Sequence, residues 1–224
     1  PALTALRCEE KFFKSIAGVR ANGSVAIWSE GKCIAKETGE LQLTDYGISG
    51  IPVFQVSRYA SKLLYEKKET EAVLDFMTDF TEDQTAAFLA ARAGTRPAKS
   101  AEMFLIGLFH KKLCDLWIRL SKIPRHKKAG DLTEKEIICL AGLIKNFRVH
   151  ICAANPYDKA QVCCGGVDTE EISHKTLESV YVPGVYFAGE ILDVDGMCGG
   201  YNLTFAWASG YVAGRAASGE ADTI

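Results

Sequence analysis

A glycine-rich segment near the C-terminus holds the residues whose types and spacing favour ligand binding. Residues 185–214 have the pattern of a short apolar strand, an acidic turn and a helix that begins after Gly199 and Gly200. The first turn of a helix leaves backbone N–H groups free, and the helix dipole adds a partial positive charge there. The two glycines have no Cβ that would keep an electron-rich group away. The segment therefore predicts a binding site for such a group at the start of the helix.

The turn before that helix carries one carboxylate that could serve a cofactor and two that could serve a metal ion. Glu190 directly follows the apolar strand, and Asp193 and Asp195 come shortly after it. Two aspartates without a third acidic ligand make a poor site for Ca²⁺ or Mg²⁺, which prefer a fuller shell of oxygen ligands. We therefore predict no metal site. An ordinary exposed turn carboxylate is the alternative interpretation of Glu190.

The same segment resembles the C-terminal flavin-binding motif of the BaiN/YhiN-like bacterial FAD-dependent oxidoreductases. The similar runs are Tyr-Phe-Ala-Gly-Glu at 186–190, Leu-Asp-Val-Asp-Gly at 192–196 and Gly-Gly-Tyr-Asn at 199–202. Two shorter runs also match the family, Gly-Gly-Val at 165–167 and Gly-Ile-Ser-Gly at 47–50. The main match is long and nearly free of gaps, so it is specific.

The resemblance implies ten cofactor-binding positions. They are Gly165, Gly166, Val167, Gly189, Glu190, Asp195, Gly199, Gly200, Tyr201 and Asn202. It places Glu190 near the ribityl and pyrophosphate region of FAD and the backbone amides of 199–202 at the pyrimidine end of the flavin. Glycines that serve only a tight turn are the alternative. The family often has His where Asp45 stands, so no catalytic role is carried over to Asp45.

The resemblance also implies that the chain is part of a longer flavoprotein. No glycines have the G-x-G-x-x-G spacing of a dinucleotide-binding turn, and Pro-Ala-Leu-Thr-Ala-Leu at 1–6 is similar to the start of the family's long insertion. We expect an α+β fragment without the Rossmann half, with weak or no FAD binding of its own. Its expected parts are a β-barrel-like subdomain (1–58 and 148–178), a small all-α subdomain (59–147) that interrupts it, and the C-terminal strand–turn–helix of a split FAD-binding domain (179–224).

Composition and charge limit the classes of function. The chain has 224 residues, of which 48% are hydrophobic, and this is enough apolar side chain for a core. Its 26 basic and 28 acidic residues give a net charge of −2, which argues against a nucleic-acid partner. Neither a leader peptide nor a long uncharged run is visible, so we expect a cytoplasmic protein without a membrane partner.

Hydrophobic alternation predicts antiparallel strands in both outer parts of the chain. Short alternating stretches at 24–28 and 32–35 are separated by glycine turns at 22–23, 30–31 and 38–39. Further strands are expected at 149–152, 160–164 and 185–188. Between these regions, a proline near the first turn favours a helix from Ile51.

Capping signals and apolar spacing predict a helical middle. Thr81 and Gln84 have the spacing of a capping box before a helix over 82–93, and Thr133 and Glu136 repeat it before a helix to about Phe147. Apolar residues three to four apart predict one helix over 100–120. We place the apolar run at 72–77 in this helical region. The basic run at 122–128 is interpreted as a solvated loop.

Nucleophiles and acid–base groups are scarce. The eight cysteines form no C-x-x-C pair, and we expect buried free thiols. None of the four histidines stands near a cysteine or serine in a triad-like arrangement, so the catalytic residue stays unknown.

In flavoenzymes the cofactor carries the hydride chemistry, so this scarcity does not argue against an enzyme. The resemblance implies a parent that transfers a hydride between a small organic substrate and FAD, with NAD(P)H as a candidate second partner. Members of the family carry names as different as a reductase of bile-acid intermediates and an aminoacetone oxidase, so no single substrate is implied. The alternative is a non-catalytic interaction module derived from a flavoprotein.

Overall fold

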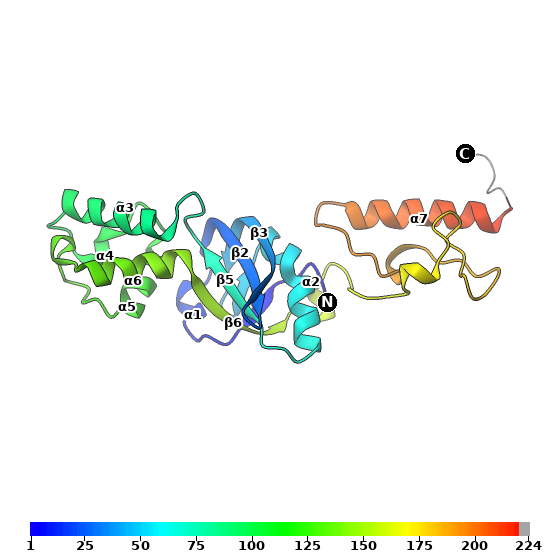
Figure 1. The fold of residues 1–224 in the computed structure, drawn as a ribbon, viewed down its shortest axis with the longest axis horizontal. Coiled ribbons are helices and arrows are strands. Elements are labelled where there is room, and N and C mark those ends of the chain that lie inside the picture. The colour runs from blue at the N-terminus through cyan, green and yellow to red at the C-terminus, as the bar shows by residue number, and fades with distance from the viewer. Residues whose placement is uncertain (220–224) are drawn as a thin grey trace. The chain divides into compact units, whose positions relative to one another are not determined.

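The computed structural model describes residues 1–219 and divides into two compact units (Figure 1). The larger unit comprises Ala5–Ala154. The smaller unit combines Pro1–Thr4 with the chain from Asn155 onward. The chain therefore passes from one unit to the other twice.

The larger unit contains a closed antiparallel barrel of six strands. Around the barrel they lie in the order β1-β4-β3-β2-β5-β6. Their bounds are β1 (Leu6–Cys8), β2 (Arg20–Ser29), β3 (Lys32–Leu43), β4 (Gly47–Ser49), β5 (Glu71–Asp75) and β6 (Phe147–Ala154). Leu6 pairs with Ala154 and so closes the barrel between the first and last strands. The predicted α+β fold with an antiparallel barrel is confirmed.

The β2–β3 hairpin confirms one predicted turn and corrects two. Glu30–Gly31 joins the two strands as predicted. The predicted turns at 22–23 and 38–39 are wrong: both glycines lie inside the strands and pair with each other. A Cβ on Gly23 would lie only 2.5 Å from the carbonyl oxygen of Asp75. Glycine at this position permits the close approach of β5 to β2.

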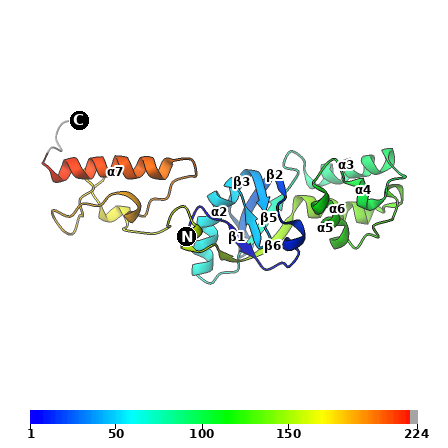
Figure 2. The ribbon, with the colours of Figure 1, turned by 180° about the vertical axis from the view of Figure 1, so that it is seen from behind.

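The run at 72–77 also differs from the prediction. It lies mostly in β5, which pairs with β2 on one side and β6 on the other. An apolar run this short suits either a buried strand or a helix, and the two neighbouring strands decide it. The helix predicted from Ile51 is confirmed as α2 (Ile51–Tyr65), which packs against β3 (Figure 2). A short helix, α1 (Phe13–Ile16), follows β1.

Four helices lie between β5 and β6 in the chain. They are α3 (Glu82–Thr95), α4 (Ala101–Phe104), α5 (Lys111–Leu120) and α6 (Glu134–Lys145). Both predicted capping boxes are present, at Thr81 and at Thr133. The single helix predicted over 100–120 is wrong, because 105–110 breaks it and Gly107 there has a φ of 92°. Apolar residues have helical spacing in both α4 and α5, so the sequence pattern did not reveal the break between them.

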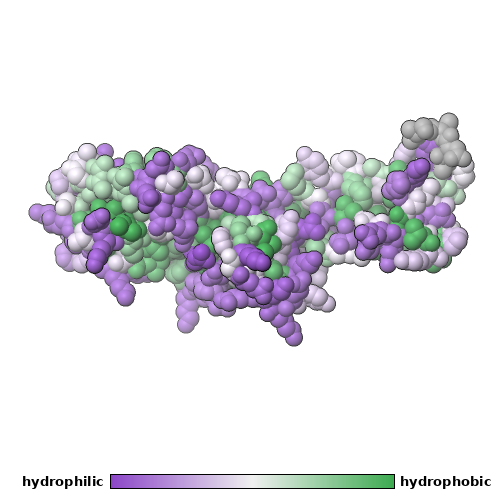
Figure 3. Space-filling model, in the orientation of Figure 1, coloured by the Kyte–Doolittle hydropathy of each residue, from purple (hydrophilic) through white to green (hydrophobic). Residues whose placement is uncertain are grey.

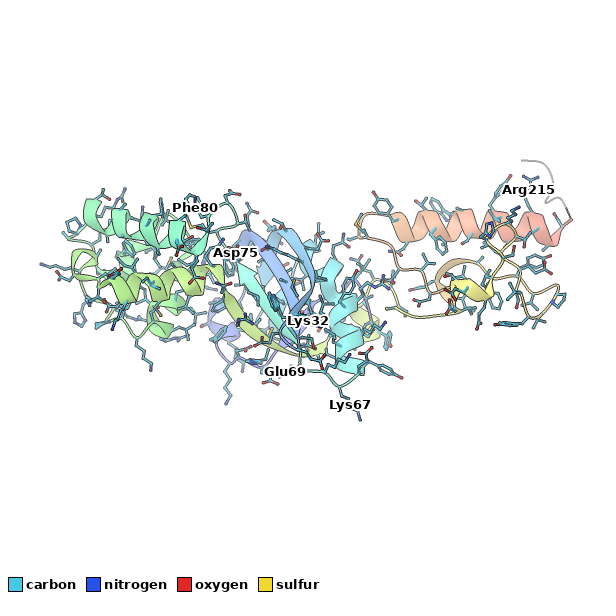
Figure 4. The ribbon with its side chains drawn as sticks, viewed as in Figure 1. Lys32, Lys67, Glu69, Asp75, Phe80 and Arg215 are labelled. Atoms are coloured by element: carbon cyan, nitrogen blue, oxygen red, sulfur yellow. The ribbon has the colours of Figure 1, made fainter. Side chains whose placement is uncertain are left out.

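Aromatic rings join these helices to the barrel. Trp117 is fully buried, and its ring centroid lies 5.3 Å from that of Phe76 and 5.0 Å from that of Phe109. At the end of β5, the Lys145 ammonium donates to the Asp75 carboxylate at 2.7 Å, and both side chains are largely buried. Figure 4 labels Asp75 near the end of β5 that leads to the helices. The helical insert is thus anchored to the barrel by apolar packing and by a shielded ion pair.

The smaller unit has little regular structure apart from α7 (Tyr201–Ala217). The strands predicted at 160–164 and 185–188 are wrong in the described residues: each segment makes only one isolated bridge, Ala2 with Val162 and Glu178 with Tyr186. Extended segments become strands only where neighbours continue the ladder. Short 3₁₀ turns occupy Tyr157–Lys159, Thr169–Glu171 and Gly189–Ile191, and another, in the larger unit, occupies Ala129–Asp131.

The cysteines are free, as predicted, but most of them are not buried. Of the eight, only Cys114 is fully buried, and this burial raises the pKa of its thiol to about 11. No helix in the described part of the chain is both long and apolar enough to span a membrane. On the face drawn in Figure 3, hydrophilic residues are interspersed with smaller apolar patches.

We predict that Gly23→Ala destabilises the barrel. The new methyl group would meet the Asp75 carbonyl at 2.5 Å, and overpacking of this kind costs about 1–3 kcal/mol. Thermal unfolding measures the loss. Gly142→Ala is the matched control, because its Cβ would lie 3.5 Å from the Glu82 carboxylate inside a helix that favours alanine. Equal melting temperatures for the two variants would contradict the close-approach explanation.

Candidate functional site

A cavity of about 370 Å³ opens beside the start of α7, within the smaller unit. Its volume lies near the lower end of the range usual for ligand sites. Its lining residues are Leu3, Gln161, Val162, Glu190, Val194, Cys198, Gly199, Gly200, Asn202, Leu203, Phe205 and Ala206. Four of the ten predicted cofactor positions are therefore brought together here: Glu190, Gly199, Gly200 and Asn202.

The first turn of α7 faces this cavity with its N–H groups uncapped. Gly200 is the N-cap residue and has a φ of 94°, a left-handed conformation that favours glycine. Within the described chain no side chain caps this helix, and its first turn contains no acidic residue. A Cβ on Gly200 would meet no atom within 4 Å. The helix end therefore offers donors, a positive dipole and open space to a ligand.

Asn202 lines the cavity, but its side chain is already engaged. Its Oδ1 accepts a hydrogen bond from the Gly196 N–H at 2.8 Å, and its Nδ2 donates to the Gly196 carbonyl at 3.0 Å. This pair of bonds fixes the acidic turn onto the first turn of α7. Asn202 therefore holds the shape of the site, and these bonds use one N–H and one acceptor position of its amide.

Glu190 performs a similar task on the other side of the cavity. Its Oε1 accepts a hydrogen bond from the backbone N–H of Cys163 at 2.6 Å. The loop that follows Cys163 is fixed further by the Val167 N–H, which donates to the Ile191 carbonyl at 2.8 Å. Glu190 is exposed in a turn, as the alternative interpretation expects, and it also makes this backbone contact. It ties two loops together at the edge of the cavity.

The predicted positions Gly165, Gly166 and Val167 do not line the cavity. Gly165 donates to the Asp193 carboxylate at 3.0 Å. A Cβ on Gly166 would collide with the Ile191 carbonyl. In this structure these glycines serve the close packing of two loops.

Gly189, Asp195 and Tyr201 also lie outside the cavity lining. The Gly189 N–H donates to the Ser209 hydroxyl at 2.9 Å, in a buried position. Ser209 was not predicted, since a serine in the middle of a mostly apolar helix resembles any small packing residue. This bond fixes the start of the acidic turn against the middle of α7.

A thiol completes a possible trio of metal ligands that the sequence did not reveal. One ligand atom each of Cys164, Asp193 and Asp195 lies within 4.8 Å of the others. However, one Asp193 oxygen already accepts the Gly165 N–H, and two carboxylates with a thiol do not supply the oxygen shell of Ca²⁺ or Mg²⁺. The absence of a metal site stays a prediction.

Distant segments supply the lining residues that sequence analysis missed. Ala2 pairs with Val162, and this bridge places Leu3 and Gln161 at the cavity. The Cys198 thiol lies 3.7 Å from the Gln161 side-chain oxygen. No local signal marks Leu3 or Gln161, because their position depends on a pairing of residues far apart in the chain.

Comparison with known proteins identifies the family. Residues 1–162 match the family model described as the HI0933-like protein barrel and H2TH domain. This match covers the barrel and its helical insert. The chain belongs to the HI0933-like family of BaiN/YhiN-like flavoproteins. The predicted membership of this family is thereby confirmed.

Named relatives of this HI0933-like protein differ in what they act on. A 3-dehydro-bile acid delta(4,6)-reductase of Clostridium scindens is 43% identical over 97% of this chain and 53% of its own length. A ribosomal RNA dihydrouridine synthase of Haemophilus influenzae is 31% identical over 90% of this chain and 47% of its own length. A ribosomal RNA dihydrouridine synthase of Escherichia coli is 32% identical over 76% of this chain and 40% of its own length. The chain spans about half the length of these curated relatives.

We predict that Ser209→Ala loosens the site without unfolding the protein. The buried Gly189 N–H would lose its acceptor, at a cost of about 1–3 kcal/mol. Its amide should then exchange with solvent roughly tenfold faster or more, as measured by hydrogen exchange. Ser218→Ala is the control, because the exposed Ser218 hydroxyl only donates to the Arg215 carbonyl near the end of α7. Unchanged exchange at Gly189 would show that another group protects this amide.

Proposed function

We propose that this chain forms one wall of the FAD site of an oxidoreductase. The observation that carries the proposal is the start of α7, which no side chain of the described residues caps. It faces a cavity that Gly199 and Gly200 help to line. The family assignment supports the choice of FAD among electron-rich ligands. Bound flavin would supply the hydride chemistry, so the protein itself would have to bind the cofactor, orient the substrate against it and polarise the flavin ring.

The described residues fit part of FAD rather than the whole cofactor. A cavity of about 370 Å³ suits a single ring system with its nearest substituents. Exposed apolar residues follow the same helix at intervals of four: Leu203, Trp207 and Tyr211 are 62%, 75% and 62% exposed. Because the relatives are about twice as long, we infer that the rest of the full-length protein covers this face and completes the cofactor site.

Each residue at the site would then have a defined task. The N–H groups at the start of α7 would stabilise negative charge that gathers on a reduced flavin, and so raise its reduction potential. Glu190 and Asn202 would hold the loops on either side of the cavity in place through their backbone partners. Gly199 and Gly200 would let the cofactor approach the backbone closely.

The names of the relatives suggest the class of substrate. A delta(4,6)-reductase and a dihydrouridine synthase are both named for the saturation of a carbon–carbon double bond. We infer an unsaturated small organic molecule as the substrate, because the 43% identical relative is named for a bile acid. NAD(P)H is the proposed electron donor, and the proposed location is the cytoplasm.

The charge at the start of α7 offers a direct test in the full-length protein. Leu203→Glu would place a carboxylate at the cavity, where it should weaken binding of reduced flavin by roughly fivefold, the effect of ~1 kcal/mol at a helix end. The reduction potential of bound flavin should fall accordingly. Ala208→Glu is the matched control, since Ala208 is exposed on the same helix but belongs neither to the cavity lining nor to the apolar row of Leu203, Trp207 and Tyr211.

Two results would contradict the proposal. Equal potentials for both variants and the unmodified protein would show that flavin does not contact this helix end. If the full-length protein bound no FAD at all, the flavoprotein function would fail for this chain, and a non-catalytic interaction module would become the better account.

A further inference from the structure

A second cavity, of about 390 Å³, lies in the larger unit beside the start of α2. It is about as large as the cavity at α7, and the two share no lining residue. Its lining residues are Arg20, Thr38, Gly39, Glu40, Gln42, Ser49, Gly50, Ile51, Pro52 and Phe54. They come from three neighbouring strands of the barrel, from Gly50 and from the first turn of α2.

The register of the strands gathers polar side chains on one side of this cavity. Arg20 of β2 pairs with Gln42 of β3, and Gln42 pairs with Ser49 of β4. Residues directly opposite each other in antiparallel strands present their side chains on the same face. Thr38 and Glu40 share that face, because alternate residues of a strand point the same way. The cavity therefore has a polar wall.

Ser49 is the residue of this wall whose side chain has no evident structural task. It is only 9% exposed, and its hydroxyl makes no hydrogen bond within residues 1–219. A hydroxyl removed from water without a partner costs stability, whereas alanine in its place would not. Ser49 lines the cavity. A molecule bound there would supply the missing hydrogen-bond partner.

The start of α2 adds backbone donors at the same place. Gly50 is the N-cap residue, no side chain of the described residues caps the helix, and its first turn contains no acidic residue. The first bond of the helical ladder runs from the Phe54 N–H to the Gly50 carbonyl at 3.0 Å. The Ile51 and Val53 N–H groups precede it, and the described residues give neither of them a backbone acceptor. These donors and the positive end of the helix dipole favour an anionic oxygen.

The charged side chains at the cavity limit the charge of that anion. An Arg20 guanidinium N–H donates to the Glu40 carboxylate at 3.4 Å, and both side chains are exposed. This pair is neutral as a whole, so the helix end, with about half an elementary charge, supplies the remaining positive field. A single negative charge suits this field. A phosphate dianion would be repelled by Glu40 more strongly than a carboxylate would.

Apolar side chains complete the cavity on the side of α2. Pro52 and Phe54 line it, and Ile51 lines it while 63% exposed. Covering such a side chain is favourable only if the ligand carries apolar surface of its own. The cavity thus combines donors for one anionic group with a wall for an apolar body.

We propose that this cavity binds a small organic carboxylate with an apolar body. The Ser49 hydroxyl and the N–H groups at the start of α2 would donate to the carboxylate oxygens, as charge-assisted hydrogen bonds. The apolar body would lie against Ile51, Pro52 and Phe54. The proposal concerns binding in the larger unit, so it does not rest on the flavin site at α7.

Calorimetric titration of the full-length protein tests the proposal with three probes. Hydrocinnamate carries the carboxylate, hydrocinnamyl alcohol is its uncharged analogue, and phenyl phosphate is the dianion. Hydrocinnamate should bind roughly tenfold more tightly than either of the others, because only it offers a single negative charge to the donors. The proposal is overturned if hydrocinnamate does not bind, or if the alcohol or the phosphate binds as tightly.

Ser49→Ala separates a binding role from a structural one. Losing a hydrogen bond to a charged group should weaken hydrocinnamate binding about tenfold. The melting temperature without ligand should stay the same or rise, because the substitution removes a buried hydroxyl that has no partner. Unchanged affinity together with a lower melting temperature would assign Ser49 to the fold and contradict the proposal.

Ile51→Glu tests the helix end with a side chain that is exposed. Its carboxylate would compete for the N–H groups at the start of α2, and binding of hydrocinnamate should weaken roughly tenfold or more. Tyr59→Glu is the matched control, since Tyr59 is 41% exposed on the same helix and does not line the cavity. Equal affinities for these two variants would overturn the proposal. Flavin absorbance shows separately whether each variant holds FAD, so a failure here is distinguishable from a failure of the flavin site.

Discussion

The pairing of β1 with β6 is the constraint on which the rest of the structure depends. Leu6 and Ala154 are 148 positions apart, and their pairing closes the barrel. The entropy cost of closing a loop rises only slowly with its length, so four helices can be inserted before β6 without preventing closure. The chain passes between the two units at positions 4–5, just before β1, and at positions 154–155, just after β6. Because β1 and β6 are paired, both passages adjoin neighbouring strands of the barrel.

The candidate site contrasts with the barrel in the way it is built. The barrel depends on apolar packing, whereas the loops around the cavity are held by hydrogen bonds from side chains to backbone. The Glu190 carboxylate accepts a hydrogen bond from the Cys163 N–H, the Asn202 amide oxygen from the Gly196 N–H, and the Ser209 hydroxyl from the Gly189 N–H. These side chains therefore bond to backbone groups of the loops, and the start of α7 presents its backbone N–H groups to a ligand. A site of this kind suits a cofactor that carries its own chemistry.

Local signals in the sequence predicted local structure well. The capping boxes at Thr81 and Thr133 located two helix starts, and the turn at Gly31 located the hairpin. The glycines at 199 and 200 located the helix end that opens on the cavity. In each case the residues that determine the structure are neighbours in the chain.

Predictions that depended on distant residues were less successful. Gly23 is a glycine because β5 approaches it, and nothing near it in the sequence indicates this. Residues 160–164 and 185–188 have strand-like composition, but the described chain gives each only one bridge. Gly165 and Gly166 match a family motif and pack against the loop at 191–193, and their role toward a cofactor stays a prediction. Net charge describes the whole chain only, because one sum averages a basic segment at 92–128 with an acidic remainder.

Hydrogen exchange at the start of α7 tests the central claim most directly. The amides of residues 201–203 would be followed in the full-length protein with and without FAD. The account predicts that FAD slows their exchange, because these N–H groups gain an acceptor that residues 1–219 do not provide. If FAD binds and the exchange of these amides stays the same, the cofactor lies elsewhere and the site described for α7 is wrong.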